Sequence, residues 1–132
     1  MRYVFGSLVV AVALAIGLSG DRAAGGKDEP KFTIKEVMQK AHTPGAKSLL
    51  KKVSSGKADE AEKKELVALY TALAQNKPPK GDEKDWKERT GKMLDAAKAA
   101  AKGDEKAAAS LAEIVNCMGC HSEHKGKKKA GG

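Results

Sequence analysis

Apolar side chains recur along this chain with the spacing of helix faces rather than of strands. Between residues 33 and 53 they fall three or four positions apart, as on one side of an α-helix. Thr33 and Glu36 have the spacing of a capping box, so the first helix is predicted to begin there. Pro44 removes a backbone donor, and the apolar pattern resumes through Val53. We therefore expect the first helix to be kinked or built of two pieces.

Three further helices are predicted, each with an acidic cap at its start. The second begins at Asp59 and ends before Pro78, the third begins at Asp82, and the fourth begins at Asp104 after Gly103. No stretch alternates with the period of two expected of a strand. Four helices with short connections predict an all-α fold, an antiparallel four-helix bundle. The residues expected to face inward are Leu66, Leu69, Tyr70 and Leu73 in the second helix, Trp86, Thr90, Met93, Leu94, Ala97 and Ala101 in the third, and Ala107, Ala108, Leu111, Ile114, Val115 and Met118 in the fourth.

The first residues follow the order typical of a secretory signal. A basic start at Arg2 precedes an apolar run over 4–16, and small residues come after it. We expect residues 1–19 to direct the protein to the periplasm or otherwise out of the cytoplasm, with no stable membrane insertion after cleavage. A retained anchor is the alternative, because no A-x-A cleavage site is present, although the run is short for a membrane span. The predicted segments are a signal peptide over 1–19, a flexible leader over 20–31, a helical domain over 32–125 and a basic disordered tail over 126–132.

The fourth helical stretch runs into Cys117-Met118-Gly119-Cys120-His121, which contains both cysteines of the chain. C-x-x-C-H is the pattern of a c-type haem attachment site. Two thiols three positions apart can reach the two vinyl groups on one edge of a porphyrin, and the adjacent imidazole can bind the iron. The motif therefore predicts one covalently attached haem c, with Cys117 and Cys120 as thioethers and His121 as the proximal iron ligand. Export fits this cofactor, because bacteria assemble covalent haem c outside the cytoplasm.

Three other kinds of site use two cysteines at this spacing. A thioredoxin-like redox pair has a strand before the motif and a helix that starts at its first cysteine, whereas here the motif is expected at the end of a helix. A zinc site would use Cys117, Cys120, His121 and His124, but structural zinc sites usually draw their ligands from two separated elements. A disulfide between the two cysteines would close a very small loop and stabilise the protein little.

A C-x-x-C-H motif on the last helix of an exported four-helix bundle resembles the class II cytochromes c, the cytochrome c-prime group and its low-spin relatives. The resemblance covers residues 32–125 and depends mainly on the motif. Class I cytochromes c differ, because their motif lies near the N-terminus and a methionine far downstream binds the iron, whereas no methionine follows His121 here. The family commonly has an aromatic and then a basic residue after the motif. Lys125 matches this pattern and His124, which we expect at the surface, does not.

The resemblance implies that the first helix covers the distal face of the haem. A methionine there would make the iron six-coordinate and suited to electron transfer, and an apolar residue would leave it five-coordinate. Met38 lies on the inward face at about the expected place, so we predict it as the distal ligand. His42 lies one turn further along and is the alternative, because neutral imidazole is a strong iron ligand; a third reading uses neither. A thioether would raise the reduction potential and an imidazole would lower it.

These features predict an exported monohaem cytochrome that carries single electrons, and not an enzyme. The alternatives are a five-coordinate haem protein that binds a gas such as nitric oxide or carbon monoxide, and a small zinc-binding domain. A formal net charge of +8 favours acidic redox partners, steered in part by Lys127, Lys128 and Lys129. Nucleic acid is not expected, because lysines alternate with acids and aromatic residues are few. The resemblance also allows a homodimer, with Tyr70 or Trp86 at the contact.

Overall fold

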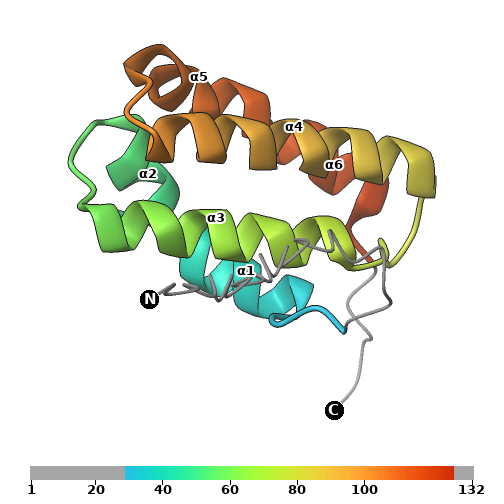
Figure 1. Ribbon diagram of the computed structural model, residues 1–132. Helices are drawn as coiled ribbons and strands as arrows, with labels where there is room; N and C mark the ends of the chain where they lie inside the picture. Colours follow the sequence, from blue (N-terminus) through green and yellow to red (C-terminus); the bar gives the residue numbers. More distant parts are fainter. Residues whose placement is uncertain (1–28, 127–132) are drawn as a thin grey trace, which may run out of the picture.

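The computed structural model describes residues 29–126, and this part of the chain is helical without any strand (Figure 1). The all-α prediction is therefore confirmed. None of these helices is both long and apolar enough to cross a membrane. The predicted signal peptide lies outside the described residues, as do most of the leader and of the basic tail. In chain order the helices are α1 (Ile34–Ala41), α2 (Leu49–Ser54), α3 (Glu60–Gln75), α4 (Glu83–Ala101), α5 (Glu105–Val115) and α6 (Cys117–His124).

The helix starts agree with the caps predicted from the sequence. The hydroxyl of Thr33 accepts a hydrogen bond from the N–H of Glu36 at 3.2 Å, and the Glu36 carboxylate accepts one from the N–H of Thr33 at 2.8 Å. Asp59, Asp82 and Asp104 each accept a backbone N–H from the third residue of α3, α4 and α5. These side chains satisfy donors that have no partner inside the helix, which explains why the polar residues mark the boundaries.

The first predicted helix consists of two pieces, as the proline indicated. α1 ends at Ala41, and α2 begins only after Ser48. The buried Ser48 hydroxyl donates to the carbonyl of Ala41 at 3.0 Å and accepts from the N–H of Lys51 at 3.3 Å. One side chain thus connects the end of α1 with the start of α2. His42 follows α1 as its C-cap, and its backbone N–H donates to the carbonyl of Met38.

The last predicted helix is interrupted as well, and here the prediction was wrong. α5 ends at Val115, and Asn116 adopts a left-handed conformation with φ +37°. Asparagine tolerates this region better than most residues because its side chain can bond locally. Its side-chain oxygen accepts the N–H of Gly119 at 3.0 Å and so caps α6. The cysteine motif therefore begins a short helix at Cys117 instead of ending a long one.

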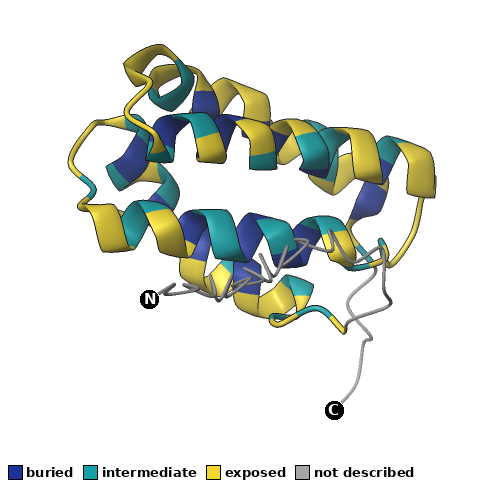
Figure 2. Ribbon diagram, viewed as in Figure 1, coloured by how far each residue is buried: buried dark blue, intermediate teal, exposed yellow. Residues whose placement is uncertain are grey.

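An apolar core connects α1 to α5. The long helices α3 and α4 lie antiparallel, α1 and α2 pack against α3, and α5 packs against α4 and α2 (Figure 1). Figure 2 shows that the buried residues lie on the sides of α3 and α4 that face each other. The largest buried side chains of the core are Tyr70, Trp86, Met93, Leu66, Leu69, Leu73 and Leu111.

Most of the predicted inward positions are buried, with two clear exceptions. Ile114 is 38% exposed and Met118 is 80% exposed. The prediction for Met118 assumed a continuous last helix, and the break before α6 changes the direction of every later side chain. Tyr70 and Trp86 are both buried inside the molecule, so neither offers a surface for pairing two copies.

Candidate functional site

The five residues predicted to hold the cofactor line one cavity of about 220 Å³. Cys117, Cys120 and His121 come from α6, and we refer to them as the α6 wall. Met38 on α1 and His42 at its end form the α1 wall. The cavity brings together residues from opposite ends of the described chain, which only the packing of the helices achieves. The other residues that line it are Leu73, Met93 and Val115.

A second hollow of about 650 Å³ adjoins the first and shares Met38, Cys120 and His121 with it. Sites for small molecules and cofactors commonly measure ~300–1,000 Å³. The larger hollow falls in that range, and the smaller cavity adds to its volume. Lys35 and Lys125 lie on the border of the larger hollow and place positive charge there. The rest of its lining is formed by Ile34, Pro79, Trp86, His124 and Gly126.

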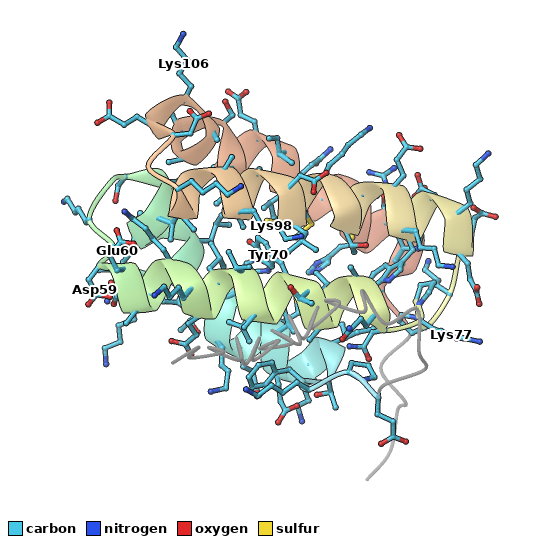
Figure 3. All side chains as sticks on the ribbon, in the orientation of Figure 1. Asp59, Glu60, Tyr70, Lys77, Lys98 and Lys106 are labelled. Carbon is cyan, nitrogen blue, oxygen red and sulfur yellow. The ribbon has the colours of Figure 1, made fainter. Side chains whose placement is uncertain are left out.

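The α1 wall is held together by hydrogen bonds of His42. Its Nδ1 lies 3.2 Å from Sδ of Met38, and its Nε2 lies 2.9 Å from the hydroxyl of Tyr70. Tyr70 is fully buried and points from α3 toward the inside of the helical array (Figure 3). Burial, and to a smaller extent the nearby His121, lower the pKa of His42 to about 4. The imidazole is therefore neutral near pH 7.

The α6 wall keeps its chemical groups more accessible. Cys117 is exposed as the first residue of α6, and Cys120 is half-buried. Both are free thiols in the structure. Burial raises the pKa of the Cys120 thiol, and this outweighs the opposite effect of nearby Arg89. Cys120 is therefore the protonated thiol near neutral pH.

These observations change the comparison with a thioredoxin-like pair. The sequence placed the motif at the end of a helix, and this reason for setting the redox pair aside was wrong, because α6 starts at Cys117. One other observation replaces it: no strand precedes the motif in the described part of the chain, whereas a thioredoxin-like pair follows a strand.

His124 is buried, although the sequence analysis expected it at the surface. Its Nε2 lies 2.7 Å from a carboxylate oxygen of Asp85, and its Nδ1 lies 3.1 Å from the carbonyl of Lys80. Its ring meets the ring of Trp86 edge-on, with centroids 5.3 Å apart. The break before α6 directs the last turn of this helix against the start of α4, which residue spacing alone cannot show. His124 therefore attaches the end of α6 to the rest of the molecule.

A charged pair supports this attachment. Nε of Arg89 lies 2.6 Å from the same carboxylate oxygen of Asp85 that contacts His124. Arg89 first, and His124 second, hold the pKa of Asp85 below its usual range. Nζ of Lys80 also donates to the carbonyl of Ser122 at 3.0 Å. Together these contacts connect the last turn of α6 with α4 and with the loop before it.

The zinc hypothesis finds no support in this arrangement. The ring nitrogens of His124 contact Asp85 and the Lys80 carbonyl, so His124 does not complete a set with the two cysteines. Within residues 29–126, no group of three or more Cys, His, Asp or Glu side chains is placed to hold a metal ion.

Three residues of the site were missed by sequence reasoning. Asn116 offered a signal, because an asparagine directly before a new helical turn is a favoured cap. Tyr70 was predicted to be buried, but nothing in its neighbourhood along the chain indicated His42 as its partner. Asp85 had the appearance of an ordinary acidic residue in a first helical turn.

The site offers two thiols, two imidazoles and the thioethers of Met38 and Met93 around an apolar space, a donor set suited to covalent attachment of a porphyrin and axial ligation of its iron. Comparisons with known protein families, with curated proteins and with solved structures found no match. The functional interpretation therefore depends on the residues described above.

Proposed function

We propose that this protein is an exported monohaem c-type cytochrome that carries single electrons between redox partners. One observation supports this more than any other. The C-x-x-C-H motif of the α6 wall and the thioether and imidazole of the α1 wall line the same cavity, from opposite ends of the described chain. When bound, haem c supplies reversible one-electron chemistry at its iron.

In this proposal the α6 wall attaches the cofactor. The thiols of Cys117 and Cys120 would hold the haem as thioethers, formed by addition of each S–H across a vinyl group, so no oxidant would be needed. Both thiols are free, and Cys117 is exposed, as such an addition requires. His121 follows on the same short helix and would supply an imidazole to the iron. The Asn116 cap and the contacts of His124 restrict how far α6 can move.

The α1 wall would complete the coordination. Met38 and His42 both line the cavity, and we propose Met38 as the distal ligand because both ring nitrogens of His42 already have partners. A filled distal position favours electron transfer over gas binding. We also interpret α1 with α2, and α5 with α6, as two interrupted helices of a four-helix bundle, the arrangement implied by the resemblance to class II cytochromes c.

The charge of the molecule agrees with an acidic redox partner. The chain carries a formal net charge of +8, and Lys35 and Lys125 border the larger hollow. Such charges would steer an acidic protein toward this side, with a rate of electron transfer that falls as salt rises.

Absorption spectra of the purified, exported protein test the function directly. We expect an intense Soret band, sharp α and β bands after reduction, and no shift when carbon monoxide is added. The double variant Cys117→Ala/Cys120→Ala serves as the control and should carry no covalent haem. A wild-type protein without a Soret band would contradict the proposal. A high-spin spectrum that shifts with carbon monoxide would favour a gas-binding protein instead.

A further inference from the structure

The contacts of His42 determine which of its ring nitrogens carries the proton. A thioether sulfur can accept a hydrogen bond but cannot donate one. The 3.2 Å contact between Nδ1 and Sδ of Met38 is therefore a hydrogen bond only when Nδ1 carries the ring proton. In the neutral ring Nε2 is then an acceptor, and the hydroxyl of Tyr70 donates to it at 2.9 Å. The result is a pair of hydrogen bonds with one direction, in which Tyr70 donates to His42 and His42 donates to Met38.

The burial of Tyr70 favours this direction of the hydrogen bonds. Tyr70 is 0% exposed, and His42 is the one hydrogen-bond partner of its hydroxyl within residues 29–126. In the other tautomer Nε2–H would donate to the Tyr70 oxygen, and the buried O–H of Tyr70 would be left without an acceptor, which is costly. The lone pair of Nε2, through which imidazole commonly binds metals, is therefore already used.

We propose that His42 is a positioning residue for Met38 and not itself an iron ligand, and that Tyr70 keeps His42 in the tautomer that this requires. The inference rests on the proposed function, because it assumes a haem between the two walls. A thioether has two lone pairs, so Sδ of Met38 can accept the Nδ1–H with one and keep the other for the iron. Methionine is flexible, and this hydrogen bond restricts where its sulfur lies.

The arrangement also affects the reduction potential. A hydrogen bond to the sulfur withdraws electron density that would otherwise stabilise the ferric state. Loss of the donor at residue 42 should therefore lower the potential while Met38 remains bound. It should also make Met38 easier to displace, because the free sulfur is no longer held in place.

The experiment compares the wild-type holoprotein with three variants. His42→Phe keeps a ring of similar size but has no donor, and His42→Asn keeps an N–H at the δ position without an imidazole. Tyr70→Phe leaves His42 but removes the group that fixes its tautomer. We would measure the reduction potential, the weak far-red absorption band of methionine-ligated ferric haem, and the affinity for added imidazole. Far-ultraviolet circular dichroism would show that each variant is folded.

The wild type should show the far-red band, and His42→Phe should keep it with a lower potential. Added imidazole should bind His42→Phe about fivefold more tightly, which corresponds to one neutral hydrogen bond. His42→Asn should recover part of the wild-type potential and part of the wild-type imidazole affinity. Tyr70→Phe should change both in the same direction as His42→Phe does, but by a smaller amount.

Two outcomes would overturn the inference while haem is present. In the first, the wild type lacks the far-red band and His42→Phe loses its low-spin spectrum, which would make His42 the ligand. In the second, the wild type and His42→Phe have the same potential and the same imidazole affinity. A wild-type protein without covalent haem would overturn the proposed function itself, and the Soret band reveals this before any variant is compared.

Discussion

The α1 wall and the α6 wall present similar chemical groups in opposite ways. On the α6 wall, Cys117 and His121 are exposed, and Cys120 is half-buried. On the α1 wall, the imidazole of His42 is bonded on one side to Met38 and on the other to a buried tyrosine. The α6 wall therefore leaves its groups available for reaction, whereas the α1 wall arranges its groups by bonding them to one another.

This difference indicates how each wall is positioned. The side chains of the α1 wall contact one another, and Val37 and Ala41, beside them on α1, are fully buried. The α6 wall is positioned by residues outside the motif, Asn116 at its start and His124 at its end. The proposed covalent attachment needs free thiols, so it requires that the residues that hold α6 differ from those that react.

The largest effect should come from the reactive groups themselves. Cys117→Ala and Cys120→Ala should each remove most of the covalently attached haem, because each would delete one of the two thioether bonds that we propose. Haem staining after denaturing electrophoresis measures this. Ser122→Ala, an exposed change on the same helix, is the control and should retain full attachment. Full covalent haem in the double cysteine variant would contradict the assignment of the α6 wall.

The next effect concerns the attachment of α6. A Cβ at Gly81 would lie 2.7 Å from Nδ1 of His124 and 2.8 Å from the carbonyl oxygen of Glu123, at φ +84°. Gly81→Ala should therefore lower the free energy of unfolding in two ways. The positive φ adds conformational strain, and the close contacts with α6 add a further loss of about 1–3 kcal/mol. Gly45→Ala is a matched control, because Gly45 has φ +90° and nothing within 4 Å. Urea unfolding measures both variants, and equal losses would mean that α6 is not held at this point.

Acid should loosen the same attachment. Arg89 and His124 hold the pKa of Asp85 low, so the folded state releases this proton more readily than the unfolded state, whose carboxyl titrates near ~3.9. The stabilisation is complete above that value and is lost as the pH falls through the lowered pKa of Asp85. Thermal unfolding between neutral pH and acid measures the loss. Asp85→Asn should be less stable at neutral pH, and its thermal stability should depend less on pH. If stability falls with acid as steeply in this variant as in the wild type, the contacts of Asp85 do not contribute to the acid sensitivity.

The smallest effect should come from removing the cap of α6 without straining the backbone. Asn116→Gly keeps the left-handed backbone but removes the side-chain oxygen that accepts the Gly119 N–H, so it should cost only a few tenths of a kcal/mol. Asn116→Ala loses the same cap and adds conformational strain of about 1–2 kcal/mol. Urea unfolding should thus rank the two variants in this order. A larger loss for Asn116→Gly would mean that the side chain does more than cap the helix.

Local patterns predicted much of the fold because their physical causes are local. Thr33 and Asp59 cap helices through bonds to residues three positions away, and the apolar spacing of α3 alone identifies its buried face. The break at Asn116 was missed because alanine-rich α5 and the motif read as one helical run. The burial of His124 was missed for the same reason, since the direction of α6 depends on that break.

The sequence by itself determined that the described part of this chain is helical, where most of its helices begin and that Cys117, Cys120 and His121 form one motif, because these properties depend on residues a few positions apart. The tertiary structure alone decided that Met38 and His42 share a cavity with that motif and that His42 meets Tyr70. It did so because side chains distant in sequence become neighbours only when the apolar faces of separate helices are buried together.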